Sequence, residues 1–175
     1  VLAWSAIQPR DYPTWALEVA PAVIGLGIMA ATYNSFRLTT LLYCLVLAHC
    51  LVLIVGGHYT YAKVPLFDAI KPLFGWERNN YDKLGHFMQG FVPALAAREI
   101  LVRGAWVRGP RMLVFLVVCV VLAISASYEL IESWAARITA PELGTAFLGT
   151  QGDEWDAQKD MGAALAGSVC ALGAT

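Results

Sequence analysis

Three clusters of polar side chains stand out in this chain, and each lies where an apolar segment begins or ends. The clusters are Asp82 with His86, Glu129 with Glu132, and the run Asp153, Asp156 and Asp160. Ionisable groups at membrane depth are costly, so several in one place usually mark a chemical or transport site. Carboxylates with imidazole suit Zn²⁺, Mn²⁺ or Fe²⁺, and an oxygen-only subset suits Mg²⁺. These residue types predict a site for a divalent metal.

The spacing within each cluster predicts that its members share one helix face. Asp82 and His86 are four residues apart, Glu129 and Glu132 are three apart, and the three aspartates follow an i, i+3, i+7 pattern. A loop at residues 56–61 adds His58 beside two glycines that would let it reach the site. The predicted metal ligands are His58, Asp82, His86, Glu132, Asp153, Asp156 and Asp160.

The chemistry predicted for such a site is metal-dependent hydrolysis. A divalent metal makes water nucleophilic near neutral pH, Glu129 would act as general base, and Lys83 or Arg78 would stabilise phosphate charge. The hypothesis is therefore a hydrolase or phosphatase that acts on a lipid or a lipid-linked substrate. The alternatives are a transporter or ion-binding protein, in which the carboxylates carry a cation or protons, and an accessory subunit of a larger membrane complex.

The basic residues beside the clusters leave a second interpretation open. Crowded carboxylates raise one another's pKa unless cations lie among them. Lys83, Lys159 and Arg78 could supply those cations, and the clusters would then be an ionic network that holds helices together. Two further expectations are a hydrogen-bonded core position for His49, and a place in the interfacial aromatic belt for Tyr59, Tyr61 and Trp76.

Composition places these clusters in a membrane protein. Of the 175 residues, 58% are hydrophobic and 14% are charged, and the mean hydropathy is +0.59. Soluble domains carry about a quarter charged residues, so this chain is too apolar for that class. The net charge of −1 excludes the broad basic surface that nucleic-acid binding requires. The expected partner is membrane lipid, together with further copies of this chain or subunits of a larger complex.

The apolar segments predict an all-α fold, a polytopic transmembrane helix bundle formed by one domain over residues 1–175. A span needs about 20 mostly apolar residues. The expected spans are residues 15–33, 38–55, 84–102, 112–128 and 161–175. The apolar start of the chain resembles the tail of a helix, which leaves room for a sixth span before Val1.

The basic residues predict the orientation of the bundle. Arg98, Arg103, Arg108 and Arg111 form its densest basic cluster, and short loops rich in Lys and Arg stay in the cytoplasm. Residues 103–111 and 34–37 are then cytoplasmic, and residues 56–81 and 133–155 are extracytoplasmic. All three polar clusters fall at the extracytoplasmic end.

Four motifs carry a resemblance to a known family: GGHYTY (56–61), FGWERNNYDKLGHFMQGF (74–91), YELIE (128–132) and FLGTQGDEWDAQKDM (147–161). With these the chain resembles the YjdF-like family of bacterial inner-membrane proteins, a domain of unknown function. Its D-K-x-x-H-F opening, later Glu pair and Asp before a small-residue helix are also similar to VanZ-like membrane proteins. The resemblance implies a multi-helix protein of the bacterial inner membrane. Its characteristic polar positions would be His58, Asp82, Lys83, His86, Glu129, Glu132, Asp153, Asp156 and Asp160.

Overall fold

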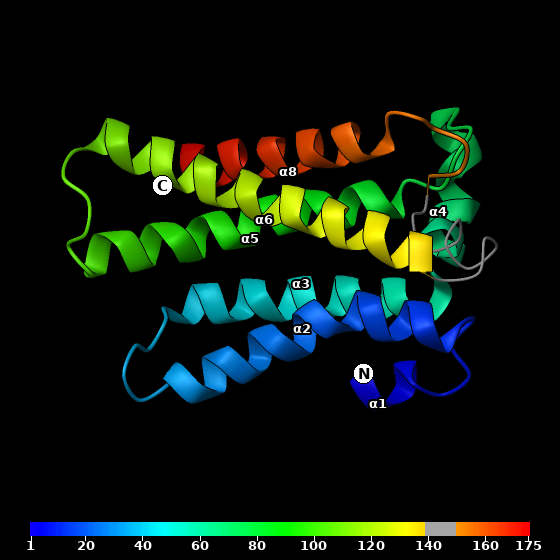
Figure 1. Ribbon diagram of the computed structural model, residues 1–175, viewed down its shortest axis with the longest axis horizontal. Helices are drawn as coiled ribbons and strands as arrows, with labels where there is room; N and C mark the ends of the chain where they lie inside the picture. The colour runs from blue at the N-terminus through cyan, green and yellow to red at the C-terminus, as the bar shows by residue number, and fades with distance from the viewer. Residues whose placement is uncertain (139–149) are drawn as a thin grey trace.

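The computed structural model describes residues 1–138 and 150–175, and every regular element in that part of the chain is a helix. The predicted all-α fold is confirmed. The long helices are α2 (Tyr12–Thr32), α3 (Thr40–Tyr59), α5 (Tyr81–Arg103), α6 (Pro110–Ile138) and α8 (Asp156–Gly173). The short ones are α1 (Leu2–Ser5), α4 (Pro65–Ile70) and the 3₁₀ turns η1 (Tyr61–Lys63) and η2 (Lys71–Phe74). The five long helices run along the longest axis of the molecule (Figure 1).

Among the described residues, three helices are long and apolar enough to cross a membrane. These are α2, α3 and α6, with mean hydropathies of 1.6, 2.3 and 2.4. The other two predicted spans, residues 84–102 and 161–175, are also helical and form most of α5 and α8. Charged residues lower their hydropathy, both in the first turns of the two helices and at Arg98, Glu99 and Arg103 of α5. The count of five spans therefore stays a prediction, although all five helices are present.

Two helix boundaries differ from the prediction. Helix α6 continues past residue 128 to Ile138, so residues 133–138 are helical rather than part of a loop. Strong helix formers such as Ala136 and Arg137 favour this extension. Helix α8 begins only at Asp156, because Gln151 and Gly152 have φ angles of 49° and 88° and form a turn before it. The rest of the predicted loop, residues 139–149, lies outside the described part of the chain.

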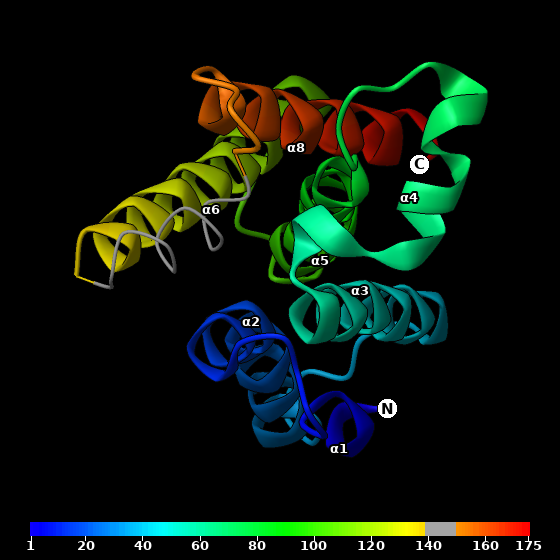
Figure 2. The same ribbon diagram turned by 90° about the vertical axis from the view of Figure 1, so that its right-hand side faces the viewer.

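Helix α5 is the centre of the packing. It contacts α3 on one side and both α6 and α8 on the other, while α2 packs against α3 (Figures 1 and 2). The core shared by α5, α6 and α8 consists of Ala94, Val117, Val121, Ala164 and Ala171. A separate core between α2 and α3 contains Val19, Ala22, Cys50 and Ile54. The molecule is thus a helical hairpin, α2–α3, placed beside a three-helix group.

Two glycines allow α5 and α8 to approach very closely. A Cβ atom at Gly90 of α5 would lie 1.8 Å from the carbonyl oxygen of Ala164. A Cβ atom at Gly167 of α8 would lie 2.1 Å from the carbonyl oxygen of Phe87. Real Cβ atoms essentially never come within 3.0 Å of another atom in this way. Only glycine fits at these two positions, and through them the backbones of α5 and α8 lie directly against each other.

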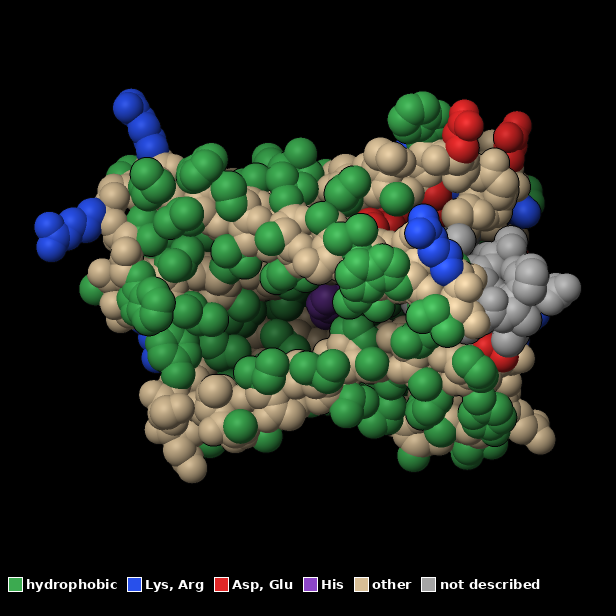
Figure 3. All heavy atoms as spheres, viewed as in Figure 1, with side chains coloured by type: hydrophobic (Ala, Val, Ile, Leu, Met, Phe, Trp, Pro, Cys, Tyr) green, Lys and Arg blue, Asp and Glu red, His purple; other side chains and the backbone are tan. Residues whose placement is uncertain are grey.

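The connections divide between the two ends of the bundle as the alternation predicted. The links α2–α3 and α5–α6 lie at one end, and the segment between α3 and α5 lies at the other with the start of α8 (Figure 1). Lys and Arg side chains protrude from the first end (Figure 3). The three polar clusters share the second end. Which end faces the cytoplasm stays a prediction.

Candidate functional site

An ionic network joins the first turns of α5 and α8. Lys83 Nζ lies 2.6 Å from Asp156 Oδ1 and 2.7 Å from Asp160 Oδ1, so one ammonium group bridges two aspartates. Arg78, three residues before α5, donates from Nη1 to the same Asp156 oxygen at 2.6 Å. Burial works against the charge on Arg78, but its hydrogen bond to Asp156 and the nearby carboxylates outweigh this and raise the pKa of Arg78. The ionic interpretation of these basic residues therefore describes part of the cluster.

Asp153 lies at the edge of this network. It precedes α8 instead of continuing the Asp156–Asp160 stripe, which corrects the predicted i, i+3, i+7 face. Its Oδ2 accepts a hydrogen bond from Lys159 Nζ at 2.5 Å, and that bond lowers the pKa of Asp153. Asp153 also lies 3.4 Å from Arg78. The structure places it with exposed Lys159 and not with His86.

Three buried side chains form a group that could hold a metal ion. One ligand atom from each of Asp82, His86 and Asp160 lies within 4.8 Å of the others. His86 Nε2 is 3.4 Å from Asp82 Oδ1 and 3.8 Å from Asp160 Oδ1. Two ligands bound about 2.1 Å from a tetrahedral ion lie about 3.4 Å apart, so this spacing suits a metal. We call these three residues the triad.

The other ring nitrogen of His86 faces two further side chains. Nδ1 lies 3.1 Å from Gln89 Oε1 and 3.7 Å from Glu129 Oε1. When Nδ1 carries the proton and donates to Gln89, Nε2 keeps its lone pair for a cation. Glu129, the predicted general base, is therefore next to the triad, and its Oε1 has no hydrogen-bond partner among the described residues.

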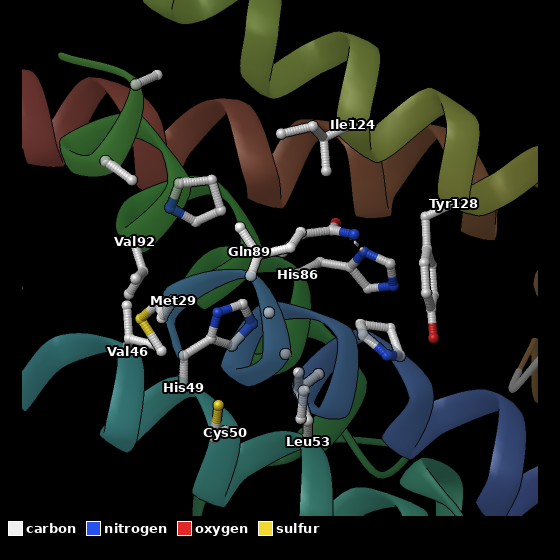
Figure 4. A pocket seen from close by; sticks show the side chains of 18 of the residues that line it. Met29, Val46, His49, Cys50, Leu53, His86, Gln89, Val92, Ile124 and Tyr128 are labelled. Atoms are coloured by element: carbon white, nitrogen blue, oxygen red, sulfur yellow. Dashed lines mark hydrogen bonds between the residues drawn. The ribbon is translucent and has the colours of Figure 1, made fainter. Parts of the chain in front are cut away.

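A cavity of about 650 Å³ runs between the α2–α3 hairpin and helices α5 and α6. Figure 3 shows a hollow on this face of the molecule, with a histidine at its floor. Asp82 and His86 of the triad line the cavity, and Figure 4 shows His86 and His49 pointing into it. Away from them the lining is apolar and includes Ile28, Met29 and Ile100. The cavity is thus polar in one part and apolar in the rest.

Glu18 of α2 is a site residue that the sequence reasoning did not include. It is 3% exposed and lines the polar part of the cavity together with Glu132, which is 9% exposed. Glu132 was predicted to be a metal ligand, but the structure places it on the cavity wall, outside the triad. Glu18 is the sole charged residue within the predicted span 15–33, a signal that could have identified it.

Two expectations for single residues were wrong. His49 is not a hydrogen-bonded core residue, because it lines the cavity and its Nε2 has no hydrogen-bond partner in the described part of the chain. Tyr61 is not part of an interfacial belt, because it is buried between α3 and α5 and also lines the cavity. A Cβ atom at Gly56 or Gly85 would come within 2.5 or 2.8 Å of its ring.

His58 is not brought to the triad. The predicted flexible loop at residues 56–59 is the last turn of α3, which directs His58 toward α1. Its Nδ1 lies 3.1 Å from the carbonyl oxygen of Ser5, and its ring packs at a tilt of 33° against Trp4 with 4.4 Å between centroids. His58 therefore ties the N-terminal segment to α3.

Comparison with known proteins shows what the chain is similar to. A family model described as "Predicted membrane protein (DUF2238)" matches residues 1–175. The inner membrane protein YjdF of Escherichia coli (strain K12) is 53% identical over 169 residues, which cover 97% of this chain and 80% of that protein. No solved structure matches the chain. The resemblance to YjdF-like proteins is confirmed, whereas the similarity to VanZ-like proteins stays a prediction.

Proposed function

This chain belongs to the DUF2238 family of predicted membrane proteins, it lies in the bacterial inner membrane, and we propose that it is a metal-dependent hydrolase acting on a membrane lipid. The observation that carries the proposal is the position of the triad. Asp82 and His86 meet Asp160 at the polar part of a cavity whose remaining lining is apolar. A lipid could place its hydrocarbon there and present an ester or phosphoester bond to the triad.

The charge of the cluster supports a divalent cation. Apart from the Asp153–Lys159 pair, two cationic side chains, Arg78 and Lys83, face four carboxylates. Those carboxylates are Asp82, Glu129, Asp156 and Asp160. With His86 protonated, these groups carry an excess of one negative charge; with His86 neutral, as a metal ligand must be, the excess is two in a buried region, where uncompensated charge is costly. One Zn²⁺ or Mn²⁺ ion balances it, and Fe²⁺ or Mg²⁺ would do the same.

The side chains around the triad have roles in such a reaction. A divalent ion supplies Lewis acidity and makes water nucleophilic near neutral pH. Glu129 takes the proton from the attacking water, the bond between the acyl or phosphoryl group and the leaving oxygen breaks, and the proton passes to that oxygen. Lys83 lies outside the cavity on the α8 side of Asp82, where its ammonium group positions Asp82 and Asp160. Gln89 holds the imidazole orientation through Nδ1.

Two alternatives have less support. A transporter for ions or protons needs polar groups along its whole path, but the far part of the cavity is lined by residues such as Ile28, Phe36 and Ile100. A purely ionic network explains the contacts of Lys83 and Arg78. It does not explain Glu129 Oε1, which has no hydrogen-bond partner among the described residues and lies 3.7 Å from His86 Nδ1.

The experiment is a lipid-cleavage assay with purified protein in mixed micelles that contain bacterial phospholipids and Zn²⁺ or Mn²⁺. Mass spectrometry should detect a released headgroup, phosphate or fatty acid. Asp82→Asn and His86→Gln should each abolish release, whereas the matched control Asp153→Asn should retain it. Cleavage that is equal in all four proteins, or no cleavage by the metal-loaded wild type, would contradict the proposal.

A further inference from the structure

The polar part of the cavity is acidic. Three carboxylates line it, Glu18, Asp82 and Glu132, and they are 3%, 8% and 9% exposed. None of the described residues that line the cavity is Lys or Arg. Within residues 1–138 and 150–175, the only basic groups that face it are the imidazoles of His49 and His86. A ligand in this part of the cavity meets three carboxyl groups.

Two of these carboxylates are short of partners. Within the described residues, Glu18 Oε2 accepts no hydrogen bond and Glu132 belongs to no ion pair, whereas Asp82 Oδ2 lies 3.5 Å from Lys83 Nζ. The cations of the ionic network lie on the other side of Asp82, where Lys83 and Arg78 contact α8. A buried carboxylate without a donor costs free energy, so the cavity is built for a ligand that donates hydrogen bonds.

Two tyrosines complete this part of the wall. Tyr128 lies beside His86, with 6.1 Å between ring centroids, and both Tyr61 and Tyr128 line the cavity. Tyr61 is held in place because α3 and α5 present Gly56 and Gly85 to its ring. Aromatic rings attract cations, and tyrosines with carboxylates are a common environment for an ammonium group. The wall thus offers a cation both charge and ring surface.

The depth of these groups suits a lipid headgroup. Glu18 lies six residues after the start of α2, and Glu132 lies six residues before the end of α6. At 1.5 Å per residue, both are about 9 Å from the helix ends at the same end of the bundle. The apolar lining continues from there toward the other end. A lipid with its headgroup at Glu18 and Glu132 would extend its hydrocarbon into the bundle.

We infer that the cavity selects a lipid whose headgroup carries an amine, with the ammonium group held between Glu18 and Glu132 beside the two tyrosines. That the occupant is a lipid rests on the proposed function, whereas the amine is a separate property of the cavity. Each carboxylate would accept a hydrogen bond from the ammonium group, and a linked ester or phosphoester would lie toward Asp82 and His86. Neutral or purely anionic headgroups offer these glutamates only uncharged O–H or N–H donors, whose hydrogen bonds are weaker than those of an ammonium group.

The test measures lipid retention instead of cleavage. Purified protein is incubated in EDTA, which suppresses cleavage, with equal amounts of phosphatidylethanolamine, phosphatidylglycerol and N-acetyl phosphatidylethanolamine, and co-purifying lipid is quantified by mass spectrometry. Wild type should retain about tenfold more phosphatidylethanolamine, which has the free amine, than either competitor. This is the ratio expected for one charge-assisted hydrogen bond. The Glu18→Gln/Glu132→Gln double variant should lose this preference. The control Glu154→Gln, an exposed acid outside the cavity, should keep it.

Two results would overturn the inference. They are equal retention of the three lipids by wild type, and a preference for the free amine that survives the double substitution. Should the double variant fail to fold, the comparison of free and N-acetylated amine on wild type still decides. If wild type retains amine lipids preferentially but cleaves no lipid, only the proposed reaction is refuted. If it cleaves lipid but shows no preference for the amine, only the inferred selectivity for an amine headgroup is refuted.

Discussion

Replacing Gly90 by alanine tests whether the close contact of α5 and α8 builds the site. The added Cβ would lie 1.8 Å from the backbone oxygen of Ala164, while real contacts of this kind are at least 3.0 Å. The two helices must therefore separate by about 1.2 Å, because a backbone atom cannot rotate away. Lys83 and His86 on α5 would then move away from Asp160 on α8.

The expected loss in free energy of unfolding follows from overpacking of the tight interface between α5 and α8. Such insertions destabilise by about 1–3 kcal/mol, and the backbone clash puts Gly90→Ala in the upper half of that range. For a chain of this size, about 2–3 kcal/mol corresponds to a fall in Tm of about 4–12 °C. Thermal unfolding of the purified protein in detergent measures it. Metal content measured on the folded protein should fall with it, because the triad spans both helices.

A matched control lies on α8. A Cβ atom at Gly162 meets nothing within 4 Å, so Gly162→Ala should leave the stability unchanged or raise it by up to about 1 kcal/mol through helix propensity. If the Gly90→Ala variant unfolds at the same temperature as the Gly162→Ala variant and its metal content is unaltered, the close packing of α5 on α8 is refuted.

Two further predictions concern the ionic network and the orientation. Lys83→Met leaves Asp156 and Asp160 without their shared ammonium group and should destabilise the protein by about 3–5 kcal/mol, whereas Lys159→Met, at an exposed pair, should cost less than about 1 kcal/mol. Chemical denaturation compares the two, and equal effects would contradict a structural role for Lys83. In a cysteine-free background, Leu73→Cys should react with a membrane-impermeant thiol reagent added to intact cells, and Val107→Cys should not. Labelling of position 107 from outside would show that the orientation is the reverse of the predicted one.

Helical spacing was sufficient to predict one side of the site. The four-residue separation of Asp82 and His86 placed them on one face of α5, and topology placed Asp160 at the same end. These relations depend on local geometry and on the alternation of spans, both of which the sequence carries. The proximity of Glu129 to His86 follows from the same reasoning.

Helix boundaries and the packing of distant helices could not be predicted from the sequence. Asp153 and His58 were misplaced because α8 begins three residues later, and α3 ends later, than the polar and glycine patterns suggested. Glu18 and the cavity depend on how the α2–α3 hairpin lies beside α5 and α6, and no local pattern encodes that arrangement. Gly90 and Gly167 carry part of that information, but their role is visible only once α5 and α8 are seen in contact.

The metal content of the purified protein tests the central claim most directly. Elemental analysis after dialysis against Zn²⁺ or Mn²⁺ and removal of free ions should give about one ion per chain for wild type and for Asp153→Asn. Asp160→Asn should contain much less, because it removes one of three ligands. A folded wild-type protein that retains no ion under these conditions, or an Asp160→Asn variant that retains as much as wild type, would contradict a metal centre at Asp82, His86 and Asp160.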